Sequence, residues 1–220
     1  MNIKVNDIQT FLDALAGPSA APGGGGAAAL SGAMSAALIS MVCNLTIGRP
    51  RFAEVEAILQ EALARAEALR QQLTELVEAD GRAFNQVMAA YGQPKETEPE
   101  REARQAAIQA ALRQATQTPL ETVMACATVI RLAGRVVDKI NPNTLGDAAA
   151  AVRLAEGGLR VAQMNIGINL AGVHDPSFEE EIQLELNKAL AGLTQTREDI
   201  FAYILTHSNA LATIVNIERI

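Results

Sequence analysis

The chain is poor in the residue types that build disulfide scaffolds and metal centres. Its 220 residues include 2 cysteines, 2 histidines and no tryptophan, and aromatic residues make up only 3%. Two cysteines are too few for a disulfide framework, and both Cys43 and Cys126 lie in apolar runs where a buried, reduced thiol is expected. The histidines form no Glu-x-x-His or His-x-x-x-His pair, so we expect no metal site.

Positive charge is also scarce. Lys and Arg total 18 against 25 Asp and Glu, which gives a net charge of −7 at pH 7. Binding to nucleic acid or to an anionic membrane requires a basic surface, so we expect neither partner. The first residues lack the charged and apolar regions of a secretory signal, and we therefore expect a cytoplasmic protein.

Apolar residues, in contrast, are abundant at 49%, which excludes a disordered chain. Residues 14–48 contain no charged residue and are long enough in principle to cross a bilayer. Glycine and proline interrupt this stretch at 17–18 and 22–26, and the remainder consists mostly of Ala, Ser, Gly and Met. Small residues spaced four apart allow close backbone contact, so a central buried helix is favoured over a membrane span.

Helical patterns fill almost all of the remaining chain, and no period-2 strand of useful length occurs. Thr118-Pro119-Leu120-Glu121 and Ser177-Phe178-Glu179-Glu180 each have the pattern of a capping box, which predicts a helix start at Thr118 and a last long helix from Ser177. Short connections make sequential helices antiparallel. We therefore expect an all-α antiparallel helical bundle, with long helices and a central Ala/Gly-rich helix, as a single domain over 1–220.

Asp80 interrupts the apolar stripe of the longest predicted helix. Alternating steps of three and four residues from Phe52 to Ala90 reach twelve positions, and eleven of them are apolar. A carboxylate on a packing face loses hydration, which costs several kcal/mol unless it is paired. Either the helix rotates and Asp80 reaches solvent, or Asp80 faces a polar pocket.

Other predicted stripes also carry polar residues. Asn165 lies in the middle of the apolar face of the helix over 144–170, and a buried amide needs hydrogen-bond partners. Asp147 lies in the first turn of that helix, where the helix dipole alone could explain it. Asn44 lies near the end of the Ala-rich helix. Together these side chains suggest a polar pocket between helices.

The glycine run after Pro22 directly precedes a helix. Bare amides at a helix N-terminus can bind an anion or stabilise a developing negative charge, and a flexible loop with no such role is the alternative. The run lacks the Gly-Lys-Ser/Thr of a P-loop, so a nucleotide site is not expected. At the far end of the following helix, Arg49 could bind a carboxylate or could be an ordinary solvated residue.

These motifs, in this order, resemble the cyclodeaminase/cyclohydrolase family of folate enzymes. The resemblance rests on Pro22-Gly23-Gly24-Gly25, on Asn44-Leu45-Thr46-Ile47-Gly48, on Asp80-Gly81-Arg82-Ala83-Phe84, on Pro94-Lys95, on Pro119-Leu120, on Asp147 and on the segment Asn165 to Leu170. It spans nearly the whole chain. Two positions depart from the family pattern, since Gly26 and Gly146 stand where the family usually has serine.

The resemblance implies a homodimer that binds a polyglutamylated tetrahydrofolate derivative as substrate and uses no other cofactor. It implies Asp80 as the base that activates water and Asp147 as a second catalytic carboxylate. The implied substrate-binding residues are Pro22, Gly23, Gly24, Gly25, Asn44, Thr46, Arg49, Lys95 and Asn165. Methenyltetrahydrofolate cyclohydrolase is the preferred activity; a formimidoyltetrahydrofolate cyclodeaminase and a non-catalytic helical dimer are the alternatives.

Overall fold

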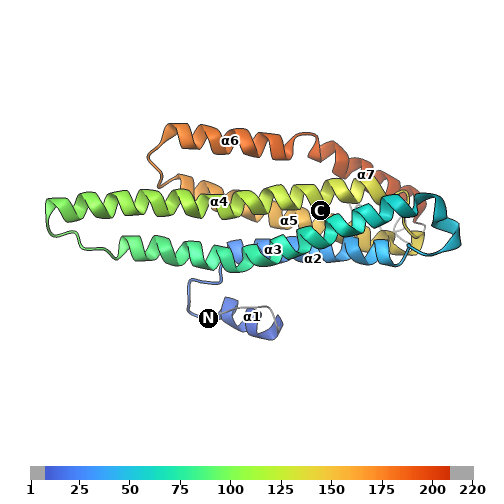
Figure 1. The fold of residues 1–220 in the computed structure, drawn as a ribbon, viewed down its shortest axis with the longest axis horizontal. Helices are drawn as coiled ribbons and strands as arrows, with labels where there is room; N and C mark the ends of the chain where they lie inside the picture. The colour runs from blue at the N-terminus through green and yellow to red at the C-terminus, as the bar shows by residue number, and fades with distance from the viewer. Residues whose placement is uncertain (1–7, 209–220) are drawn as a thin grey trace. The chain divides into compact units, whose positions relative to one another are not determined.

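The computed structural model describes residues 8–208, and every regular element among them is a helix (Figure 1). The elements are α1 (Ile8–Ala16), α2 (Gly24–Asn44), η1 (Pro50–Val55), α3 (Glu56–Tyr91), α4 (Glu98–Val136), η2 (Pro142–Thr144), α5 (Leu145–Leu170), α6 (Pro176–Leu190) and α7 (Leu193–His207). The predicted all-α helical bundle is confirmed.

The chain forms two compact units. Among the described residues, the first comprises 8–30, 73–124 and 158–189, and the second comprises 31–72, 125–157 and 190–208. Helices α2 to α5 each contribute residues to both units. A single domain over 1–220 stays a prediction.

In the first unit, α3, α4 and the segment after α5 share an apolar cluster. Ala90, Ile108 and Leu112 are buried in it, and Val87 and Val173 pack against them. The apolar stripe predicted for α3 continues through this unit, since Leu73, Leu76, Ala83 and Ala90 are all buried.

In the second unit, α2 packs closely on α5 through small residues. Ser35 donates a hydrogen bond from Oγ to the Ala151 carbonyl at 2.6 Å, and Ser31 donates to the Leu154 carbonyl at 2.8 Å. Within the described residues, α2 is also the helix long and apolar enough to span a membrane, yet 61% of its most apolar window is buried. This burial supports the predicted core helix.

The helix start predicted at Thr118 is wrong, because α4 runs without a break from Glu98 to Val136. Pro119 lies inside α4, where a proline removes one backbone donor and leaves the carbonyl four residues earlier without its helical partner. That carbonyl belongs to Ala115, and it accepts a hydrogen bond from Asn169 Nδ2 at 2.9 Å. A side chain of α5 thus replaces the missing helical bond.

A single long last helix is also wrong. Helix α6 begins at Pro176 and its cap is Asp175, whose Oδ1 accepts the N–H groups of Ser177 at 3.0 Å and Phe178 at 3.3 Å. The helix ends at Leu190, and Gly192 then adopts a left-handed conformation with φ of +70° before α7 begins. Most residues with a side chain are strained in that conformation, whereas glycine adopts it readily. Gly192 therefore allows the chain to turn between α6 and α7, so that the two helices are separate.

Candidate active site

A cavity of about 400 Å³ lies within the first unit. Its walls come from the loop before α2, the first turn of α2, the last third of α3, the middle of α4, and the end of α5 with the residues that follow it. The lining residues are Ala20, Ala21, Gly23, Gly24, Gly25, Asp80, Ala83, Phe84, Val87, Tyr91, Leu112, Ala115, Asn165, Ile168, Asn169 and Gly172. The sequence-predicted residues Asp80, Asn165 and Gly23 to Gly25 therefore share one cavity.

Asp80 is held at the N-terminus of α2. Its Oδ2 accepts a hydrogen bond from the Gly26 N–H at 2.9 Å. A Cβ added at Gly25 would lie 2.5 Å from the Asp80 Cγ and 2.8 Å from its Oδ2, so only glycine at this position leaves room for the carboxylate. The glycine run thus begins α2 and also supplies the space and the N–H group that hold the Asp80 carboxylate.

Burial raises the pKa of the Asp80 carboxyl above its ordinary value, and the hydrogen bond from the Gly26 N–H opposes this rise only in part. No ion pair joins Asp80 to a cationic side chain between residues 8 and 208. A half-buried carboxylate without a cationic partner is a better proton acceptor than an exposed one, which suits a general base.

Asn165 presents an amide that the protein itself does not satisfy. Its Nδ2 is buried, and no acceptor for it lies within the described part of the chain. A buried amide without a partner is costly unless a ligand or water accepts the bond. Asn165 also lines the cavity, so this unsatisfied amide lies at the cavity wall.

Sequence reasoning missed the apolar wall of the cavity. Phe84, Val87 and Tyr91 line it and lie four, seven and eleven residues after Asp80 on the same helix face. Asn169 lies one turn after Asn165 on α5 and lines it as well. Helical spacing from Asp80 and Asn165 was the signal that could have found these residues.

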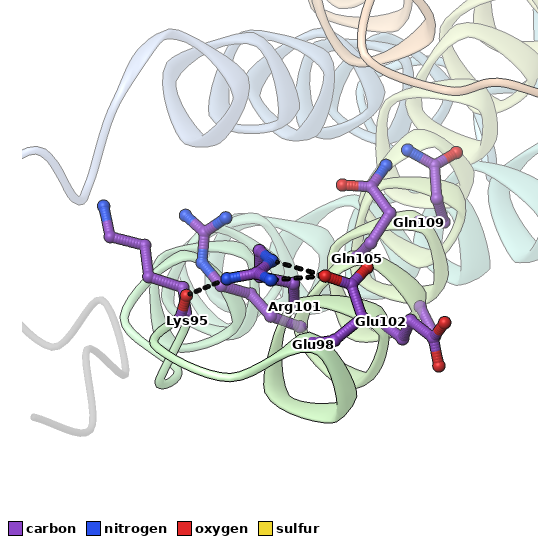
Figure 2. Close-up of a pocket in the computed structure, with 8 residues that line it drawn as sticks. Lys95, Glu98, Arg101, Glu102, Gln105 and Gln109 are labelled. Atoms are coloured by element: carbon purple, nitrogen blue, oxygen red, sulfur yellow. Dashed lines mark hydrogen bonds and ion pairs between the residues drawn. The ribbon is translucent and has the colours of Figure 1, made fainter.

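A second depression in the first unit lies along the start of α4 and is shown in Figure 2. It has a volume of about 710 Å³ and includes Lys95. Arg101 pairs with Glu98 and also donates to the Glu96 carbonyl at 3.0 Å, while the Lys95 ammonium extends away from this pair (Figure 2). We call this depression the α4 groove.

The remaining predicted residues lie outside the cavity wall. Pro22 is buried between two residues that do line the cavity, and Asn44, Thr46, Arg49 and Asp147 belong to the second unit. Their functional roles stay predictions.

The predicted residues of the second unit differ in exposure. Asn44 and Arg49 are exposed, and Asp147 is half-buried in the first turn of α5. Thr46 is buried; its Oγ1 donates to the Val42 carbonyl at 2.7 Å and accepts the Asn141 N–H at 2.9 Å. These two bonds give the Thr46 hydroxyl a structural role.

The sequence as a whole identifies the family. A family model described as formiminotransferase-cyclodeaminase matches residues 7–188. The chain belongs to this family. The match includes every helix that lines the cavity, so Asp80 and Asn165 lie within the region that defines the formiminotransferase-cyclodeaminase family.

Relatives of the family differ in length. A methenyltetrahydrofolate cyclohydrolase from Methylorubrum extorquens is 48% identical over 202 residues, which cover 92% of this chain and 97% of the relative. A formimidoyltransferase-cyclodeaminase from Rattus norvegicus is 34% identical over 183 residues, and the match covers 83% of this chain but only 34% of the rat protein. The crystal structure of formiminotetrahydrofolate cyclodeaminase from Thermotoga maritima has a TM-score of 0.79 and 25% identity, covering 94% of this chain and 97% of that chain.

Both departures from the family pattern leave room for the usual serine. A Cβ at Gly26 would lie 3.5 Å from the Val77 carbonyl oxygen and 3.8 Å from the Asp80 Oδ2, which are ordinary contact distances. A Cβ at Gly146 would meet nothing within 4 Å. Steric crowding therefore does not explain either glycine.

Proposed function

We propose that the chain is a methenyltetrahydrofolate cyclohydrolase, which hydrolyses 5,10-methenyltetrahydrofolate to 10-formyltetrahydrofolate. The observation that carries this proposal is the half-buried Asp80 carboxylate, which lines the cavity without a cationic partner. The methenyl substrate is a cation at the carbon that reacts, so an unpaired carboxylate both attracts it and accepts a proton from water. The relative from Methylorubrum extorquens supports the same activity.

In the first step, the ionised Asp80 removes a proton from a water molecule while the oxygen of that water bonds to the methenyl carbon. The product is a neutral tetrahedral adduct that carries a hydroxyl group between N5 and N10, and Asp80 is then protonated. General-base assistance of this kind contributes about 10²–10⁴-fold to a rate.

In the second step, the bond between the carbon and N5 breaks. Protonated Asp80 supplies the proton that N5 needs, the adduct hydroxyl loses its proton to solvent, and the formyl group stays on N10. Overall, one water is consumed and one proton is released.

The other cavity residues suit recognition of the substrate. Asn165 Nδ2 can donate to a pterin acceptor, and the N–H groups of Gly24 and Gly25 have no acceptor within α2 because they begin the helix. Phe84 and Tyr91 supply aromatic surface for the flat rings. A cavity of about 400 Å³ lies within the range of small-molecule sites, roughly 300–1,000 Å³.

The direct test is the loss of near-ultraviolet methenyltetrahydrofolate absorbance on addition of the purified protein, against a buffer control for spontaneous hydrolysis. Because Asp80 must be ionised and burial raises its pKa, kcat should rise with pH along a limb that lies above the ordinary aspartate range. A rate that is independent of pH through that region would contradict Asp80 as the base. Ammonia release from formimidoyltetrahydrofolate without cyclohydrolase turnover would select the cyclodeaminase activity.

We further propose that the substrate is polyglutamylated and that Lys95, at the α4 groove, binds the tail. Replacement of Lys95 by alanine should raise the KM for a polyglutamylated substrate about 2–5-fold and leave the monoglutamate KM unchanged, since exposed ion pairs contribute little. The difference should shrink at high salt. Lys188→Ala, which removes an exposed lysine that pairs with Glu185, is the matched control. Equal effects on both substrates would contradict tail binding.

A homodimer in the cytoplasm completes the proposal. On α5, Val161, Met164 and Ile168 share one face and are 38%, 69% and 70% exposed, and no charged residue occurs between Val161 and Val173. In a chain of net charge −7, an uncharged apolar face is where a second copy meets the least repulsion. Sedimentation should give twice the 23.2 kDa chain mass, and a monomer at micromolar concentration would contradict the dimer.

A further inference from the structure

We propose that Gln109 is a positioning residue for the substrate: its side chain fastens the connection between α5 and α6 onto α4 and so fixes one wall of the cavity. This inference rests on the proposed function. Gln109 does not line the cavity, so its role there would be exerted through the backbone that it holds. It does line the α4 groove, and the KM is therefore measured with the monoglutamate substrate, which has no tail to reach that groove.

The side-chain amide of Gln109 bonds to the backbone at two points. Its Nε2 donates to the Gly172 carbonyl at 2.8 Å, and its Oε1 accepts the His174 N–H at 2.7 Å. A carbonyl and an N–H two residues apart are thus both satisfied by one side chain, as a neighbouring strand would satisfy them. We call residues 171–175 the α5–α6 turn.

Two further contacts press the α5–α6 turn against α4. Val173, between the two bonded residues, packs on the cluster that contains Ile108 and Leu112. A Cβ at Gly172 would lie 2.8 Å from Leu112 Cδ1, so the backbone of the turn lies directly against the end of this α4 side chain, which would have to shift to admit a Cβ. Arg113, one turn after Gln109 on α4, pairs with Asp175, which caps α6.

The held segment is also cavity wall. Gly172 and Leu112 both line the cavity, and so do Asn169 and its hydrogen-bond partner residue Ala115. Asn165, with its unsatisfied amide, lies one turn before Asn169 on the same helix. If the turn moved off α4, the end of α5 would lose one of its two attachments, and substrate binding would have to restore the wall.

Glutamine is required at this position because the two bonds have opposite polarity. A glutamate could still accept the His174 N–H, but it has no hydrogen to donate to the Gly172 carbonyl and would place a negative charge beside that oxygen. Alanine loses both bonds. The pair of variants therefore separates the contribution of the volume of the side chain from that of its donor.

The experiment compares Gln109→Ala and Gln109→Glu with the wild type. The control is Gln86→Ala, which removes an exposed glutamine of α3 for which the structure shows no hydrogen bond. For Gln109→Ala we expect the KM for methenyltetrahydrofolate to rise about tenfold, with kcat within about twofold of the wild type, because two neutral hydrogen bonds are lost away from the reacting atoms. Gln109→Glu should raise the KM at least as much as the alanine variant.

Hydrogen exchange supplies a readout that needs no activity. The amide of His174 should exchange about tenfold faster in Gln109→Ala and close to the wild-type rate in Gln109→Glu, because only the alanine variant loses its acceptor. An unchanged KM, or a kcat that falls in step with the melting temperature, would overturn the positioning role. If the wild type shows no cyclohydrolase turnover, the proposed function fails, and an unchanged His174 exchange rate would separately refute the role of Gln109 in holding the turn.

Discussion

Replacement of Asp80 by asparagine should lower kcat for methenyltetrahydrofolate hydrolysis by at least about 100-fold, the lower limit for loss of a general base. Asparagine can still accept the Gly26 N–H through its amide oxygen, so the side chain should keep its position at the start of α2. It cannot accept a proton from water. Steady-state kinetics at the pH optimum, with the spontaneous rate subtracted, measure the effect.

The matched control is Glu78→Gln on the same helix. Glu78 pairs with Arg82 at 3.4 Å on the surface, and its loss should change kcat by less than about twofold, since exposed ion pairs contribute little. Full turnover by Asp80→Asn would refute Asp80 as the base. A wild type that is inactive in both the cyclohydrolase and the cyclodeaminase assay would instead favour the non-catalytic helical dimer.

The same substitution should change the pH dependence of stability. Burial raises the folded-state pKa of Asp80, so the folded protein holds that proton more tightly than the unfolded chain does. Stability is then lost as pH rises from the unfolded pKa through the raised folded pKa. Asp80→Asn should remove this loss and should not melt below the wild type at neutral pH.

Replacement of Gly25 by alanine should have the second large effect. The new Cβ would overlap the Asp80 carboxylate, and either the carboxylate or the start of α2 must move. We expect a loss of about 1–3 kcal/mol in the free energy of unfolding, as for other overpacked sites, together with a fall of at least about 100-fold in kcat. Thermal melts and steady-state kinetics on one preparation measure both.

Gly26→Ala is the control for this prediction, because its Cβ would meet only ordinary contacts and its N–H would remain to bond Asp80. We expect that variant to keep at least about a third of the wild-type kcat. Such a fall corresponds to a rise of less than about 1 kcal/mol in the activation free energy. Similar losses in both variants would show that the glycine run acts through flexibility rather than through the space it leaves for Asp80.

The position of Asp80 was predictable from the sequence because local periodicity decides it. Leu73, Leu76 and Ala83 are buried as the stripe on α3 required, and the one charged residue among them lies in the cavity. Asn165 was predictable for the same reason, since a helix face determines what each neighbour contacts.

The helix ends were less predictable, since tertiary contacts override local signals. A proline and a capping sequence at Thr118 normally start a helix, but the partner that Asn169 supplies to Ala115 lets α4 continue. Nothing near Pro119 in the sequence announces a residue 50 positions later. The hydrogen bonds from Gln109 to the α5–α6 turn also join residues that are far apart in the sequence. They could not be predicted, because a single glutamine on a helix forms no characteristic sequence pattern.

Pro119 also bears on how α5 is aligned along α4. A carbonyl inside a continuous helix already accepts its helical N–H, so a side chain that bonds to it, as Ser35 does at Ala151, must share the oxygen. Pro119 leaves the Ala115 carbonyl without that competing N–H, and Asn169 can reach it at only one axial position of α5. The register between these two helices is therefore specified by a pair of polar groups, whereas apolar packing alone would tolerate a shift by one turn. An alanine at 119 would improve helix propensity but restore the competing N–H. It would therefore weaken the bond between Asn169 and Ala115, which fixes where Asn165 lies along the cavity.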